Sequence, residues 1–186
     1  MKSPFRPSDV PFLLVLVLLQ SASAIVAQDV GSHVLRIDGY SYTKTLGNGK
    51  FITSASFTIG GHRWCLRYYP NGMNQSYSDW ISVYLCLDKT EVNQVRAKFT
   101  ISLLDKEGNP VPSYIRHCAV TRTYSAKASN GEWGYAEVIR RSDLEGSPYL
   151  KDDVFSLRCD ITVPKEIFIT KAIPVSAVHP GDMKQE

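Results

Sequence analysis

The sequence predicts an all-β protein, an antiparallel β-sandwich of seven or eight strands with one short helix. From residue 33 onward, apolar and polar residues alternate in short segments, which is the period of a half-buried strand. Gly, Pro, Asn and Asp residues separate these segments and mark turns. Aromatic residues make up 11% of the chain, as is typical of a β-rich core or an aromatic-lined binding surface.

The expected strands can be followed in chain order. They cover residues 33–37, 51–59, 62–69, 81–87, 95–103 and 155–163. Gly60 and Gly61 separate two of them, and because both can adopt positive φ, we expect a tight hairpin there. Ser142 and Glu145 have the spacing of a capping box, which predicts the short helix, ended by Gly146.

The composition is that of an ordinary folded protein of about one domain. The chain has 186 residues, of which 44% are hydrophobic and 21% charged. Twenty-one Lys and Arg against eighteen Asp and Glu give a net charge of +3, with no run of more than two like charges. This even distribution argues against nucleic acid as a partner.

The first 24 residues differ from the rest. Residues 12–19 form an unbroken apolar run, and Ala22-Ser23-Ala24 follows as a cleavage pattern, so this segment is typical of a secretory signal peptide. The alternatives are an unused leader or a misplaced start of the coding sequence. The run is too short to span a bilayer, and no other stretch resembles a membrane span. We therefore expect a leader over 1–24, a domain over 25–170 and a linker-like tail over 171–186.

The cysteines offer no metal or redox motif. Cys65, Cys86, Cys118 and Cys159 include no C-x-x-C pair. Cys159 shares the parity of core residues, whereas Cys65 and Cys86 share that of Arg and Ser residues, so a bond from Cys65 to Cys159 would need one strand reversed. We expect all four to be free thiols that serve mainly in packing.

Enzyme motifs are missing from the sequence. The four His residues have no metal-binding spacing, and neither a G-x-S-x-G motif nor a P-loop occurs. His62 reads as a strand residue, and the pair Asp152-Asp153 precedes a strand and should be solvated. The sequence therefore predicts no catalytic site, no metal and no cofactor.

Several motifs resemble one known family, the MATH domain of plant MATH-BTB proteins, especially the kind expanded in grasses. The resemblance covers residues 21–180 and rests on segments at 21–27, 33–40, 60–64, 68–72, 95–99, 132–135, 139–141 and 158–160. It implies a TRAF-like β-sandwich that binds an extended Ser/Thr-rich peptide of a client protein. In that family a following BTB domain docks the pair onto a cullin-type ubiquitin ligase.

The resemblance also bears on partners and location. Residues 173–182 resemble the segment that leads into the BTB domain, but the sequence given ends at Glu186 without one. The implied partners are client peptides and BTB-containing or other MATH proteins. The family implies the cytoplasm or nucleus, whereas the leader favours the secretory route for the chain as written.

The residues that line the peptide groove of the family can be matched, one at a time, to positions in this sequence. The resemblance implies that it is lined by Tyr84, Phe99, Tyr124, Trp133, Gly134 and Tyr135. The parity of Tyr84 agrees, since it points away from the core face of its strand. The parity of Phe99 is that of core residues, so either a bulge turns it outward or it belongs to the core.

The loop aromatics have two interpretations. Trp133 and Tyr135 either form exposed anchors for a peptide or close the end of the sandwich. Better-known animal members carry a Lys-Asp pair before this tryptophan, where this chain has Gly131-Glu132. The difference bears on the identity of the client.

A second class of protein remains open, namely a secreted immunoglobulin-like or lectin-like β-sandwich. The leader and the sequon Asn74-Gln75-Ser76 favour it. The cysteine spacing opposes it, and Leu157 stands where an immunoglobulin domain has tyrosine.

Overall fold

Two antiparallel sheets lie face to face in the computed structural model, which describes residues 27–89, 94–127 and 131–165. The elements of these residues, in chain order, are β1 (Gln28–Asp38), α1 (Tyr40–Thr43), β2 (Ile52–Thr53), β3 (Phe57–Ile59), β4 (His62–Tyr69), the 3₁₀ turn η1 (Gln75–Tyr77), β5 (Trp80–Leu87), β6 (Val95–Leu104), β7 (Pro110–Tyr124), β8 (Glu132–Arg140), α2 (Arg141–Glu145) and β9 (Val154–Pro164).

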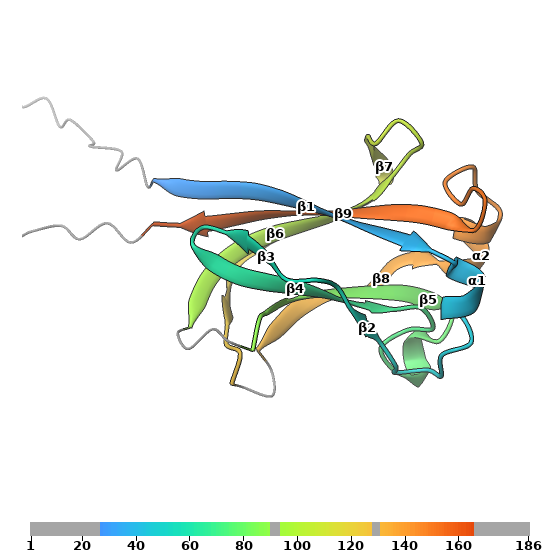
Figure 1. The fold of residues 1–186 in the computed structure, drawn as a ribbon, viewed down its shortest axis with the longest axis horizontal. Helices are drawn as coiled ribbons and strands as arrows, with labels where there is room; N and C mark the ends of the chain where they lie inside the picture. The colour runs from blue at the N-terminus through green and yellow to red at the C-terminus, as the bar shows by residue number, and fades with distance from the viewer. Residues whose placement is uncertain (1–26, 90–93, 128–130, 166–186) are drawn as a thin grey trace, which may run out of the picture.

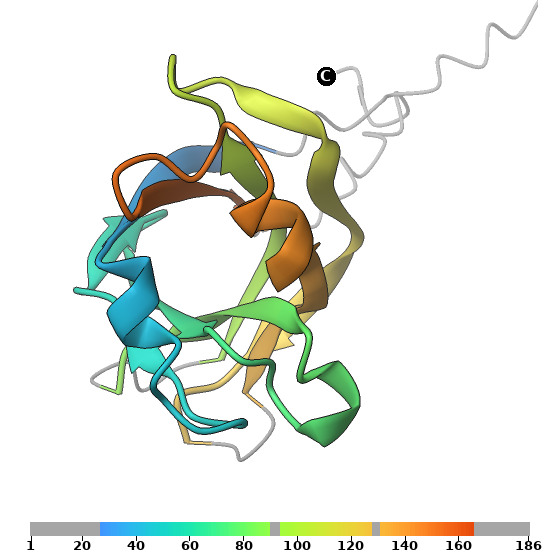
Figure 2. The same ribbon diagram turned by 90° about the vertical axis from the view of Figure 1, so that its right-hand side faces the viewer.

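The strand order confirms the predicted sandwich. One sheet has the order β1-β9-β6-β7, and the other has the order β2-β4-β5-β8, with β3 also paired to β4. The two layers are seen from the side in Figure 1 and from one end in Figure 2. β7 ends one sheet and β8 ends the other. This arrangement places two edge strands next to each other, and we call this side of the sandwich the β7–β8 edge.

The core fills the space between the sheets. In β9, every second residue from Phe155 to Val163 is buried, and in β5 the inward residues Ile81, Val83 and Leu85 are completely buried. Burying one such aliphatic or aromatic side chain contributes about 1.5–3 kcal/mol. The alternation in the sequence therefore predicted the inward faces of these strands correctly.

The hairpin between β3 and β4 forms as predicted. Gly60 and Gly61 have φ of 62° and 76°, as a two-residue turn of the primed type requires. The single strand expected over 51–59 is divided into β2 and β3. Between them the Ser54 N–H donates to the Leu66 carbonyl oxygen at 2.8 Å, and the Ser54 hydroxyl accepts a hydrogen bond from the Leu66 N–H at 3.0 Å.

Two short helices lie at one end of the sandwich, where the sequence predicted one (Figure 1). α2 lies where expected, but the predicted capping box is wrong: Arg140 is the N-cap, and no side chain caps the helix. Glu145 instead accepts hydrogen bonds from the Tyr40 hydroxyl at 2.9 Å and from Lys44 Nζ at 3.0 Å. These tertiary hydrogen bonds tie the end of α2 to α1 and to Lys44, the residue that follows it.

The predicted leader over 1–24 and the tail over 171–186 lie outside the described residues, so the domain limits stay predictions. In the part of the chain that the structure describes, none of the helices has the length and apolar character needed to cross a membrane.

Candidate functional site

Five of the six predicted groove residues gather at the β7–β8 edge. Trp133, Gly134 and Tyr135 lie on β8, Tyr124 ends β7, and Phe99 lies on the neighbouring strand β6. In the strand register, Leu85 faces Trp133 and Val83 faces Tyr135. Because Leu85 and Val83 point into the core, Trp133 and Tyr135 point to the same inner side, but at an edge where solvent can reach them.

Trp133 joins the two sheets. Its indole Nε1 donates a hydrogen bond of 2.8 Å to the carbonyl oxygen of Thr123 on β7. The guanidinium of Arg122 lies 4.4 Å from the centre of the indole ring, within the range of a cation–π contact. The side chain is only half-buried, so it both closes this side of the sandwich and offers part of its ring to solvent.

A chain of aromatic rings leads from Tyr135 at the surface into the core. The ring of Phe99 lies 5.7 Å from that of Tyr135 and 6.4 Å from that of Tyr124. Tyr124 in turn meets Trp64 edge to face at 5.0 Å. These distances are those of favourable aromatic pairs, which contribute about 0.5–1.5 kcal/mol each beyond their buried area.

The depths of these rings differ. Phe99 is 3% exposed and Tyr124 is completely buried. Of the two alternatives for Phe99, the structure therefore favours the core, although the pairing of β6 with β7 shifts register next to it. Tyr135 is half-buried. Phe99 and Tyr124 therefore lie beneath Tyr135 and support its ring from the core.

The hydroxyl of Tyr124 is buried and has no hydrogen-bond partner within the described structure. Burial raises the pKa of this phenol well above its usual value, with the nearby thiols of Cys159 and Cys118 adding to the shift. The group is therefore a neutral hydroxyl in an apolar setting, and it costs free energy of folding.

Tyr84, on β5, points to the opposite face of the sheet from Trp133. It points to the outer face of the five-stranded sheet, where it meets Tyr69 at 5.7 Å, and its hydroxyl contacts the thioether of Met73. Burial raises the pKa of Tyr84 to about 12. The sequence parity predicted this outward orientation correctly, but the structure separates Tyr84 from the other predicted groove residues with aromatic rings, Phe99, Tyr124, Trp133 and Tyr135.

Gly134 allows β8 to approach β5 closely. It lies directly opposite Tyr84 in the register. A Cβ at this position would clash with the carbonyl oxygen of Val83 and lie 2.5 Å from Tyr84 Cα and 2.7 Å from Tyr84 Cγ. Only glycine fits this position while the strand stays where it is.

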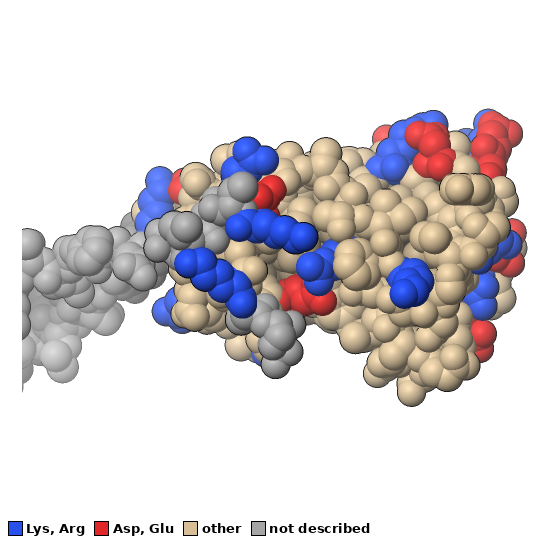
Figure 3. Space-filling view, turned by 60° about the horizontal axis from the view of Figure 1, so that its bottom comes forward, with Lys and Arg blue, Asp and Glu red and all other residues tan. Residues whose placement is uncertain are grey.

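Sequence reasoning missed an ion pair on the outer face. Arg67 of β4 reaches across β5 and contacts Glu132 of β8. Both side chains are partly buried. No local pattern could have indicated the pair, because the two residues are 65 positions apart. Figure 3 shows the face that lies at the bottom of Figure 1, where several basic side chains, with an acidic one among them, gather over one half of the molecule, and charges of both signs gather at its other end.

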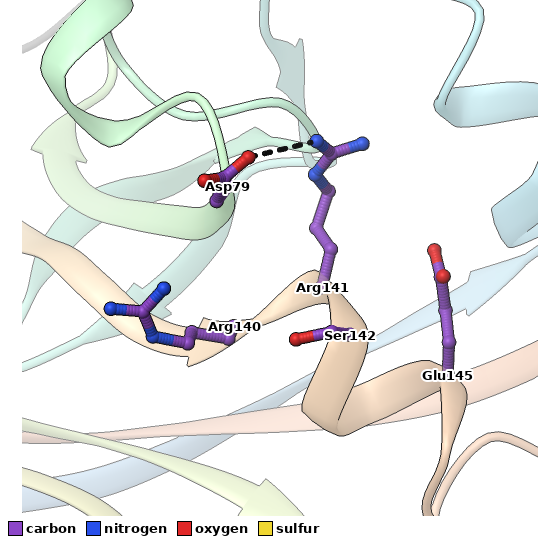
Figure 4. A pocket seen from close by; sticks show the side chains of 5 residues that line it. All are labelled: Asp79, Arg140, Arg141, Ser142 and Glu145. Carbon is purple, nitrogen blue, oxygen red and sulfur yellow. Dashed lines mark ion pairs between the residues drawn. The ribbon is translucent and has the colours of Figure 1, made fainter.

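A polar pocket of about 340 Å³ lies near α2, away from the aromatic rings around Trp133 and Tyr135. Its lining consists of Asp79, Arg140, Arg141, Ser142 and Glu145, as Figure 4 shows. Arg141 contacts Asp79 at 3.6 Å, Arg140 lies over Trp80 at 4.7 Å, and the charged ends diverge instead of meeting at one point. Among the described residues, no group of three or more His, Cys, Asp or Glu side chains could hold a metal ion.

Comparison with solved structures defines the class of protein. A solved structure of TRAF5 from Notothenia coriiceps matches with a TM-score of 0.53 over 77% of each chain, at 14% sequence identity. At this identity the match concerns the fold alone, and it confirms a TRAF-like β-sandwich.

Comparison of sequences defines the family. The model of the MATH domain matches residues 32–161. BTB/POZ and MATH domain-containing proteins 5 and 6 of Arabidopsis thaliana are 39% and 37% identical to this chain, over 79% and 77% of its length. The chain belongs to the MATH domain family, as the resemblance predicted, and this family is a protein-interaction module and not an enzyme.

The chain spans little more than a third of the length of these relatives, 37% and 35%. The family membership selects the MATH interpretation of the fold over the immunoglobulin-like or lectin-like alternative. The predicted secretion rests on residues 1–24, which lie outside the described residues.

Proposed function

We propose that this MATH domain binds extended segments of client proteins at the β7–β8 edge. The observation that carries the proposal is the half-buried Trp133, held between two edge strands by Thr123 and Arg122. Within the described residues, β7 pairs only with β6 and β8 only with β5, so each has one edge without a paired strand, where Trp133 and Arg116 already bond the carbonyl oxygens of Thr123 and Glu137. An extended peptide at such an edge gains main-chain hydrogen bonds and places alternate side chains in pockets.

The neighbouring side chains support recognition of polar segments. Trp133 and Tyr135 supply rigid ring surfaces, while the guanidinium groups of Arg116 and Arg122 supply donors beside them. Arg116 is partly engaged, since its Nε donates to the carbonyl oxygen of Glu137 at 2.9 Å. Small hydroxyl side chains suit a shallow site of this kind. The preference for Ser/Thr-rich clients comes from the family resemblance and is part of the proposal.

The wider role extends the same proposal. The Arabidopsis relatives are named for both a BTB/POZ and a MATH domain. We propose that this chain performs client recognition for a cullin-type ubiquitin ligase adaptor, with BTB-containing or other MATH proteins as partners. Co-precipitation of the tagged chain with a BTB-containing MATH protein tests this wider role separately from peptide binding.

The direct test measures peptide affinity of a Trp133→Ala variant. A labelled Ser/Thr-rich peptide is titrated with the protein and followed by fluorescence anisotropy. Loss of an aromatic anchor costs about 2 kcal/mol of binding free energy, so we expect the dissociation constant to rise about 30-fold. The melting temperature should fall by only a few degrees, because the ring lies at the edge of the core and is only half-buried.

Trp80→Ala is the matched control. Trp80 is also a half-buried tryptophan, and the guanidinium of Arg140 lies 4.7 Å from the centre of its ring. Trp80 lies opposite Arg140, at the end of β8 that is remote from Trp133. Its removal should leave peptide affinity unchanged. Equal losses of affinity in the two variants, or no loss in either, would show that the β7–β8 edge is not the peptide site.

A further inference from the structure

Cys65 and Cys86 lie directly opposite each other in adjacent strands. They are paired in the register of β4 and β5, and their Sγ atoms are 2.6 Å apart. Opposed residues of antiparallel strands have Cα atoms about 4.5–5.5 Å apart, within the range that a disulfide spans. The sulfur atoms are only about 0.6 Å beyond the length of an S–S bond, which is about 2.05 Å.

We propose that Cys65 and Cys86 are a redox modification site, a dithiol that a low-molecular-weight disulfide converts reversibly into a cross-strand disulfide. This inference does not depend on peptide binding. Sequence parity placed both cysteines on the outer face of the sheet, and the structure adds that they are neighbours there. Both are free thiols in the structure.

The surroundings allow a small oxidant to reach the pair. Cys65 and Cys86 are 8% and 4% exposed, so access is restricted but present at Cys65. Cys86 also lines a pocket of about 180 Å³, together with the half-buried Arg67 and Glu132 and the exposed Lys89. The pocket lies beside Cys86, whose sulfur atom contacts that of Cys65.

The local charges favour Cys65 as the attacking thiolate. The hydrogen bond from the Cys86 thiol and the nearby guanidinium of Arg67 lower the pKa of Cys65, although burial opposes them. The pKa of Cys86 is raised by the same contact with Cys65 and by burial. Cys86 therefore keeps its proton at the first step.

The exchange has two steps and is balanced. The Cys65 thiolate attacks one sulfur of the small disulfide, its S–S bond breaks, and a mixed disulfide forms at Cys65 while one small thiolate leaves. Cys86 then loses its proton to that thiolate or to solvent and attacks the Sγ of Cys65. The second small thiolate leaves, so two protein thiols and one small disulfide give one protein disulfide and two small thiols.

The other two cysteines lack this geometry. Cys118 lies on β7 and Cys159 on β9, both in the other sheet, and their register partners include no cysteine. Cys159 is completely buried, and burial raises the pKa of its thiol. Cys118→Ser is therefore the matched control for the loss of a cysteine outside the pair.

The test uses the full chain, reduced and then incubated with glutathione disulfide at pH 8. After alkylation of the remaining thiols, mass spectrometry of the intact protein and of its peptides counts and locates the oxidised cysteines. In the wild-type protein we expect two of the four thiols to be lost in a link between Cys65 and Cys86, and dithiothreitol should restore both. Cys118→Ser, which has three thiols, should form the same link. The oxidised protein should melt about 5–10 °C higher, because the link closes a loop of about 22 residues.

Cys86→Ser should stop at the mixed disulfide on Cys65, and Cys86→Ala provides a second variant if serine at this site prevents folding. Four thiols that persist under these conditions would overturn the proposal. So would oxidation that occurs only at Cys118, or only between two molecules, since neither needs the β4–β5 pairing.

Discussion

Gly134→Ala tests the close approach of β8 to β5. The added methyl group would clash with the Val83 carbonyl oxygen and lie 2.5 Å from Tyr84 Cα. Favourable carbon–carbon contacts lie at about 3.5–4.0 Å, so the two strands must separate by about 1 Å. The atoms in the way include backbone, which cannot rotate aside as the end of a flexible side chain can.

We expect the substitution to lower the free energy of unfolding by about 3 kcal/mol, the upper part of the range for overpacking. For a chain of this size, this corresponds to a fall in melting temperature of about 10 °C. Calorimetry or circular dichroism at several denaturant concentrations measures both quantities. Peptide affinity should fall as well, since β8 carries Trp133 and Tyr135.

Gly47→Ala is the control for this prediction. A Cβ at Gly47 would meet only Lys50 Cγ, at 3.8 Å, which is ordinary van der Waals contact, and its φ is not among the positive ones. Its stability should stay within about 0.5 kcal/mol of the wild-type value. If Gly134→Ala is as stable as Gly47→Ala, the reasoning about the β5–β8 approach is refuted.

Two further predictions concern buried and titrating groups. Tyr124→Phe removes a buried hydroxyl that has no hydrogen-bond partner in the described structure. The free energy of unfolding, measured by urea denaturation, should therefore stay the same or rise by up to about 1 kcal/mol. A loss of more than about 1 kcal/mol would show that the hydroxyl has a partner. Hydrogen bonds from Lys44 and from the Tyr40 hydroxyl hold the pKa of Glu145 below its usual value. The ionised carboxylate therefore contributes to the free energy of unfolding above about pH 4.3, and this contribution is lost as the pH falls through the lower pKa of the folded state. Glu145→Gln should therefore be less stable than wild type near pH 7, by less than about 1 kcal/mol because the pair is more than a third exposed. This difference in stability should narrow as the pH falls below about 4.3. A gap that stays constant between pH 7 and pH 3 in thermal melts would contradict the assignment.

Much of the candidate site was predicted from the sequence, but not its geometry. The motifs around Tyr84, Trp133 and Tyr135 indicated the family, and parity predicted that Tyr84 points outward. The strands β7 and β8, which form the edge, were not predicted individually, because their apolar residues do not alternate cleanly. Their burial patterns are irregular, and both pairings shift register.

The depth of Phe99 and Tyr124 depended on the assembly of both sheets. Sequence parity left Phe99 with two alternatives, and nothing in the segment around Tyr124 indicated complete burial. Their rings are covered by Trp64 and Tyr135, which come from other strands. Burial of an edge residue depends on how the opposite sheet packs over it, and a single segment does not contain this information.

By itself, the sequence determined the properties that depend on near neighbours in the chain. Alternation predicted the faces of β5, β6 and β9, and two adjacent glycines predicted the β3–β4 hairpin, because side-chain direction and turn conformation are local. The tertiary structure alone decided that Cys65 meets Cys86, that Arg67 reaches Glu132 and that Gly134 lies against Tyr84. Each of these contacts depends on strand order and register, which are set when distant segments bury their apolar faces together, and a shift of one residue would turn every one of these side chains to the opposite face.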